Sequence, residues 1–297
     1  MPAPWRARLQ RFLRDAGEWW ILPGLAIFLP WLWCFRFYRR CCASPFLFRE
    51  QVAAALAQLP HLSADQTGEW AARHRLVLLV DRADAFLSRF RGDRWLDRHV
   101  CRCGDPWPNE PFIGITFHFG AGLWSLRDIF RHGRRVSFVS IRFERFFRAA
   151  CVSRHGALWR VREVARAGGA PVIYTGGSKQ AIRDALSSGV SVAGLIDVPA
   201  ALAPQAIEQN FLGSSAWFPP GLLVLARERQ TPVVVYAMDV DYGSGQRSLR
   251  VRQLAAAEIG EQLADVVDFL AGEIERNPPA WHGWPDLPAF RSRPGVS

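Results

Sequence analysis

Residues 112–128 read FIGITFHFGAGLWSLRD, and this stretch holds the pattern that decides the fold. FIGITFHF, residues 112–119, is a short apolar run rich in strand-forming residues, typical of a strand buried on both faces of a sheet. Small residues follow it, and a helix is expected from about 121 to 132. We therefore expect a strand, a tight turn and a helix, with His118 at the end of the strand.

The alternation of strands and helices continues along the chain, while residues 231–254 read as a hairpin. It predicts an α/β fold with a mixed, mostly parallel sheet flanked by helices on both faces. The other expected strands are 136–143, 171–176 and 191–197, and the expected helices are 48–59, 75–91, 157–167, 178–187, 219–229 and 256–276.

Two titratable residues fall where such a sheet binds its ligands. His118 and Asp197 each follow an expected strand, and ligands of open α/β sheets lie at the carboxyl ends of the strands. The amides of Gly120, Ala121 and Gly122 are expected at a helix N-terminus, which suits an oxyanion or a phosphate. A histidine beside such a site fits a general base that activates a hydroxyl for acyl transfer. A hydrogen-bonded structural histidine is the alternative.

The composition restricts the partners. The formal net charge is +10 over 297 residues, and all but one of the 37 Lys+Arg residues are arginine, which suits phosphate and carboxylate groups. A basic chain can meet nucleic acid, anionic lipid or an acidic protein. No helix-turn-helix, RRM or zinc-finger pattern is present, so we expect no nucleic-acid partner. The six cysteines contain no C-x-x-C pair, so we expect reduced, cytosolic thiols and no metal or cofactor.

The N-terminal segment has the features of a membrane anchor. WWILPGLAIFLPWLWCF, residues 19–35, carries no charge, has tryptophans near both ends and is flanked by arginines. Its length is close to the minimum of about 17 residues for a spanning helix. We expect a short span or an interfacial hairpin, preceded by an amphipathic helix on an anionic membrane surface; a buried core helix is the alternative. The expected division is an anchor segment at 1–40 and an α/β domain at 41–297.

The sequence 118-HFGAGL-123 resembles the H-F-G-N-W-E motif, of the form H-x4-D/E, of the late (secondary) acyltransferases of lipid A biosynthesis. The likeness extends in order along the chain. Asp197 stands where that family has the aspartate of P-D-Q, and Arg142 stands at the place of its Y-R-P. Further matches are 211-FLG-213, 219-PPGLLVLARE-228, Pro278, Trp281 and Trp284.

The resemblance implies a membrane-associated acyltransferase on the cytoplasmic face of a bacterial inner membrane, without metal or cofactor. His118 would be the general base, with Asp197 beside it. Gly120, Gly122 and Arg142 would bind an oxyanion or a substrate phosphate. The donor would be acyl carrier protein or acyl-CoA, and the acceptor a hydroxyl of a membrane lipid.

One departure bears on activity, because Leu123 occupies the place of the family's acid. One explanation is that another acid replaces it, with Asp197 preferred over Asp128 and Glu144. Alternatively His118 acts alone on an activated donor, or the protein binds lipid without catalysis. The departures also fit an acyltransferase of a polyene-pigment lipid pathway rather than of lipid A.

Overall fold

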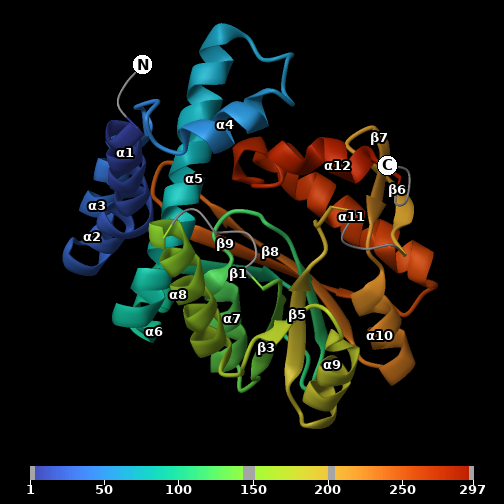
Figure 1. The fold of residues 1–297 in the computed structure, drawn as a ribbon. Coiled ribbons are helices and arrows are strands. Elements are labelled where there is room, and N and C mark those ends of the chain that lie inside the picture. Colours follow the sequence, from blue (N-terminus) through green and yellow to red (C-terminus); the bar gives the residue numbers. More distant parts are fainter. Residues whose placement is uncertain (1–3, 143–150, 200–204, 294–297) are drawn as a thin grey trace.

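The computed structural model describes residues 4–142, 151–199 and 205–293. In these residues seven strands form one sheet, ordered β1-β9-β8-β2-β5-β3-β4 (Figure 1). Only the β8–β9 pair is antiparallel within it. The strands are β1 (Val100–Gly104), β2 (Ile113–Thr116), β3 (Val136–Ser140), β4 (Ile173–Tyr174), β5 (Ser191–Leu195), β8 (Val233–Val240) and β9 (Arg247–Leu254); β6 (Ile207–Phe211) and β7 (Ser214–Phe218) form a separate hairpin.

The expected mixed, mostly parallel sheet flanked by helices is therefore confirmed. The helices are α1 (Pro4–Ala16), α2 (Leu22–Phe28), α3 (Trp31–Cys42), α4 (Arg49–Leu56), α5 (Ala64–Phe90), α6 (Asp93–His99), α7 (Leu123–Arg131), α8 (Cys151–Gly168), α9 (Ser178–Ser187), α10 (Gly221–Arg229), α11 (Ile259–Arg276) and α12 (Leu287–Arg291), with short helical turns η1 (Gly17–Ile21), η4 (Pro278–Ala280) and η5 (Trp284–Asp286). Sequence analysis missed β1, α6 and the β6–β7 hairpin. Expected helix 178–187 coincides with α9.

The central strand β8 shows how the sheet is buried on both faces. Val234, Tyr236 and Met238 belong to one hydrophobic cluster, and the alternating Val233 and Val235 belong to another. Helices α5 and α7 contribute to the first cluster, and α10 and α11 to the second. Successive side chains of a strand point to opposite faces, so an unbroken apolar strand needs helices on both sides.

The N-terminal segment corrects an expectation. Residues 19–35 are divided among η1, α2 and α3, and the chain is extended at Leu29 and Pro30 between the last two. In the part of the chain that the structure describes, no helix is long and apolar enough to cross a membrane. The expectation of a single spanning helix is therefore wrong. The interfacial alternative and the boundary at residue 40 stay predictions.

A buried ion pair joins the N-terminal helices to the sheet. Asp84 of α5 and Arg247 of β9 have fully buried side chains, and Arg247 Nε donates to Asp84 at 3.2 Å. The guanidinium also lies over Trp31 and Trp95, 4.3 Å and 4.8 Å from their ring centroids. Trp31 donates in turn to the Gly245 carbonyl in the β8–β9 hairpin. Helix α3 is thus part of the core.

Removing one partner of this pair is expected to destabilise the protein strongly. Arg247→Met leaves an uncompensated carboxylate in the core, so we expect the free energy of unfolding to fall by about 3–5 kcal/mol. The double variant Arg247→Met/Asp84→Leu should recover part of that loss, because neither charge remains buried. Urea unfolding measures both. Asp84→Leu is measured alone as well. If the loss in the double variant equals the sum of the losses in Arg247→Met and Asp84→Leu, the two charges do not interact.

Candidate active site

The register of two neighbouring strands brings His118 and Asp197 together. Strands β2 and β5 pair in parallel, with Thr116 opposite Leu195, so the two residues stand opposite each other beyond the strand ends. His118 Nδ1 lies 3.1 Å from Asp197 Oδ1. The Asp197 side chain is fully buried, whereas the His118 side chain is 46% exposed and lines a cavity. The expected placement of both residues at one edge of the sheet is confirmed; their catalytic roles stay predictions.

The Asp197 carboxylate is held by further donors. The His118 amide donates to both oxygens, at 3.0 Å and 2.8 Å, and Trp281 Nε1 donates to Oδ2 at 2.9 Å. Three N–H contacts from two parts of the chain therefore point at the oxygens of one carboxylate. Trp281 lies near the end of the chain, so this contact joins the C-terminal segment to the strand ends.

The contact with Asp197 sets the protonation of the imidazole. An ionised carboxylate only accepts hydrogen bonds, so His118 Nδ1 carries the proton and Nε2 has the free lone pair. Desolvation lowers the pKa of His118, but the charge and hydrogen bonds of Asp197 outweigh it and raise this pKa above its ordinary value. This is the arrangement of a general base whose tautomer is fixed by an acid.

The turn after His118 corrects part of the expected oxyanion site. The Gly120 amide donates to the Ala280 carbonyl at 2.8 Å, and the Ala121 amide to the Met238 carbonyl at 3.1 Å. Gly120 and Ala121 therefore have no free amide to offer an oxyanion, but Gly120 lines the cavity, and its part in substrate binding stays a prediction. The Gly122 amide has no hydrogen-bond partner within the described ranges, and it precedes the first turn of α7.

The C-terminal segment holds this turn from the other side. Phe119 forms a bridge with Trp281, and the His282 amide donates to the His118 carbonyl at 2.7 Å. His282 Nε2 also lies 3.0 Å from the Gly120 carbonyl. The segment therefore adds a short antiparallel contact to the end of β2.

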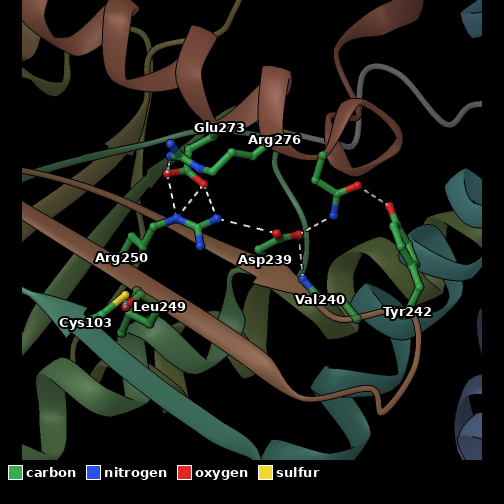
Figure 2. A network of polar contacts seen from close by, with 9 residues as sticks. Cys103, Asp239, Val240, Tyr242, Leu249, Arg250, Glu273 and Arg276 are labelled. Carbon is green, nitrogen blue, oxygen red and sulfur yellow. Dashed lines mark hydrogen bonds and ion pairs between the residues drawn. The ribbon is translucent and has the colours of Figure 1, made fainter.

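Figure 2 shows the polar network at the start of that segment. Arg250 of β9 donates through Nε to both oxygens of Glu273 in α11, at 2.7 Å and 2.8 Å, and Arg276 pairs with the same carboxylate. Asn277 donates to Asp239 at 2.6 Å. These contacts fix the point at which the chain leaves α11 and turns toward His118.

A cavity of about 480 Å³ lies in front of His118, on the face of the sheet covered by α5, α7 and α8. Its mouth is polar. There Arg160 donates to the Asp81 side chain at 2.7 Å, and Arg82 lies 3.6 Å from Glu18 of η1. Apolar wall residues include Leu78, Leu123, Leu126, Phe138, Val161, Val164, Val172 and Leu195. The shape fits a molecule with an apolar chain and a polar end.

The other candidate residues lie elsewhere. Leu123, where the resemblance implies an acid, is a buried part of the apolar wall. Asp128 accepts from Trp107 at 2.7 Å and does not line the cavity, so it cannot orient His118. Arg142 is exposed, with its guanidinium 4.9 Å from the Tyr174 ring centroid, and does not line the cavity either. Glu144 lies outside the described residues.

Sequence analysis missed three residues of the site: Trp281, His282 and Asp286. Asp286 lines the cavity, and desolvation raises its pKa against the opposing effect of His118. Burial lowers the pKa of His282. The Trp281 match in the resemblance was the available signal, but the pattern does not say what its indole contacts.

In the described ranges no group of three or more His, Cys, Asp or Glu side chains is placed to hold a metal ion.

Comparison with known proteins gives little further guidance. No family model matches the chain, and no curated protein matches it. The chain is similar to the crystal structure of the 1-acyl-sn-glycerophosphate acyltransferase PlsC from Thermotoga maritima. The identity is 15% and the TM-score 0.37, and the match covers 82% of this chain and 95% of that chain. At this distance the likeness carries none of the argument that follows.

Gly120 and Gly122 form a matched pair of positions for testing the tight turn that follows His118. A Cβ at Gly120 would lie 1.8 Å from the Met238 carbonyl oxygen, and φ there is +59°, whereas a Cβ at Gly122 would meet nothing within 4 Å. We expect Gly120→Ala to lower the free energy of unfolding by at least about 1–2 kcal/mol, and Gly122→Ala by about 1 kcal/mol or less. Denaturant unfolding measures both. Equal losses would contradict the tight turn.

Proposed function

We propose that this protein is an acyltransferase that moves an acyl group from a thioester to a hydroxyl of a lipid-like acceptor. One observation carries the proposal: an imidazole with a buried carboxylate on Nδ1 lines a largely apolar cavity. The carboxylate fits a base, and the apolar wall fits an acyl chain. The late acyltransferases of lipid A biosynthesis, which the sequence resembles, catalyse the same kind of acyl transfer.

His118 Nε2 takes the proton of the acceptor hydroxyl as its oxygen attacks the thioester carbonyl. The new C–O bond forms a tetrahedral oxyanion, which the Gly122 amide is placed to stabilise. The C–S bond then breaks, the ester remains, and the departing thiolate recovers the proton from the imidazolium. Asp197 stays ionised and balances the charge of His118 during the reaction.

The donor in this proposal is acyl carrier protein or acyl-CoA, and the acceptor is a membrane lipid, either a lipid A precursor or the lipid of a polyene-pigment pathway. A lining that includes arginines and carboxylates suits both headgroups and the phosphopantetheine arm. Non-catalytic lipid binding is the competing function, and the cavity alone would serve it. The buried carboxylate on His118 favours catalysis, because binding an apolar chain requires no oriented base.

Two substitutions separate catalysis from binding. With purified protein, an acyl-CoA donor and membrane lipid, we expect His118→Ala to lower kcat/KM by about 10²–10⁴-fold. Asp197→Asn should lower it by more than about tenfold. Ester formation that survives His118→Ala in correctly folded protein would end the assignment of His118 as the base.

The pH profile of the Asp197 variant tests the dyad itself. His118 accepts a proton only when neutral, so kcat/KM falls as the pH drops through its pKa, which Asp197 raises. Asp197→Asn removes that charge, so the acidic limb should move to lower pH. An unmoved limb would mean that Asp197 does not act on the reacting imidazole.

We also propose that the N-terminal helices rest on the cytoplasmic surface of the bacterial inner membrane. Helices α1, α2 and α3 form one flank of the molecule (Figure 1). They carry large exposed apolar side chains among exposed arginines, a composition that suits an anionic lipid interface. The apolar residues are Trp5, Leu9, Phe12, Leu13, Phe28, Leu32, Trp33 and Phe37, together with Ile21 of η1.

The surface proposal is tested by substitution, because deleting residues 1–40 would remove core residues of α3. Phe28 and Trp33 are 78% and 71% exposed. We expect Phe28→Ser/Trp33→Ser to reduce cosedimentation with phosphatidylglycerol vesicles severalfold and to leave the melting temperature nearly unchanged. Phe130→Ser, at a 47% exposed residue of α7, is the control. Undiminished sedimentation of the double variant would reject this surface.

A further inference from the structure

The cavity wall contains a buried hydroxyl without a well-formed hydrogen bond. Tyr236 of β8 lines the cavity and is 1% exposed, and among the described residues its hydroxyl makes no well-formed hydrogen bond, with only the Ser125 hydroxyl near it. Buried polar groups are nearly always hydrogen-bonded, because an unpaired one loses its hydration without compensation. The cavity in front of this hydroxyl is the space from which a partner can come.

The fold holds the tyrosine ring in place. Val235 pairs with Ile115, and the same register sets Tyr236 beside Thr116, on the face of the sheet that also carries His118. A Cβ at Gly114 would lie 3.0 Å from the Tyr236 ring, so the glycine makes room for it. Trp107 packs edge-on at a centroid distance of 5.4 Å. Neighbours on both sides therefore prevent the ring from turning toward another partner.

A second hydroxyl lies close to the first. Ser125 of α7 lines the cavity and donates to the Gly122 carbonyl at 2.6 Å, which leaves its oxygen as an acceptor. Burial raises the pKa of Tyr236, and an imperfect hydrogen bond with the Ser125 hydroxyl offsets part of that rise, so a ligand oxygen between the two would improve the hydrogen bonding of both. Leu123, Leu126 and Phe138 line the same cavity. The two hydroxyls are thus a polar spot in a largely apolar wall.

We propose that this spot recognises an oxygen atom within the ligand's apolar chain, so that the acyl group is hydroxylated or otherwise oxygenated. The Tyr236 hydroxyl donates to that oxygen, and Ser125 accepts from it when it is a hydroxyl. A plain hydrocarbon chain would leave both polar groups facing methylenes, and sites built to hydrogen-bond discriminate against ligands that lack the matching group. The identity of the ligand as an acyl donor rests on the proposed function.

Donor preference tests the inference. We compare dodecanoyl-CoA with its 3-hydroxy and 12-hydroxy forms, and expect the full-length wild type to favour one hydroxylated donor in kcat/KM by about tenfold. Tyr236→Phe keeps the ring and should abolish that preference. Tyr242→Phe is the matched control, since its hydroxyl donates to Asn277 at 2.6 Å outside the cavity (Figure 2). The same preference in wild type and Tyr236→Phe, or no preference in wild type, would overturn the proposal.

Binding measured without turnover separates this inference from the proposed function. His118→Ala should bind the preferred hydroxydodecanoic acid about tenfold more tightly than dodecanoic acid in titration calorimetry, and His118→Ala/Tyr236→Phe should bind both alike. A binding preference without any transfer by wild type would support the polar spot and reject the acyltransferase. Transfer with equal binding of both acids, or no binding of either acid, would reject the polar spot.

Discussion

The carboxylate of Asp197 is the contact on which the candidate site depends. It accepts hydrogen bonds from the His118 amide, the His118 ring and the Trp281 indole, and its side chain is fully buried. These donors come from β2 and from the C-terminal segment, while Asp197 itself follows β5. One ionised group therefore joins three distant parts of the chain. Burying it without those donors would be costly, so the same contacts that satisfy the charge also orient the imidazole.

Sequence patterns anticipated the parts of the site that follow from strand order. His118 and Asp197 could be placed at one edge of the sheet because each ends an apolar run, and parallel strands end on the same side. The use of the turn amides could not be anticipated. Gly120 donates to Ala280, and Ala121 to Met238, and these long-range pairings leave no mark in the local sequence. A glycine-rich helix start predicts free amides only when no other segment packs against it.

The apolar run at residues 19–35 led to the wrong expectation of a membrane-spanning helix. Trp31, Phe35 and Tyr38 of α3 are buried in the core, whereas Leu32 and Trp33 of the same helix are exposed. Both sets are apolar, so the sequence shows one continuous hydrophobic stretch although only one face packs on α5 and the sheet. Proline at position 30 then ends the continuity that a spanning helix needs. Apolar residues on the unburied face still require an explanation, and a lipid surface provides one without a span.

The leucine at position 123 has a consequence for the cavity. A carboxylate there would bring a charge to the first turn of α7, beside the apolar wall of the cavity. In the proposed reaction Asp197, which follows β5, is the acid that contacts the imidazole, so the first turn of α7 can carry an apolar side chain. Leu123 is one of the apolar residues that line the cavity. The Gly122 amide also keeps its attraction for a developing oxyanion, because no neighbouring carboxylate at position 123 opposes it. The departure from the motif thus fits a relocated acid and a more apolar acyl site.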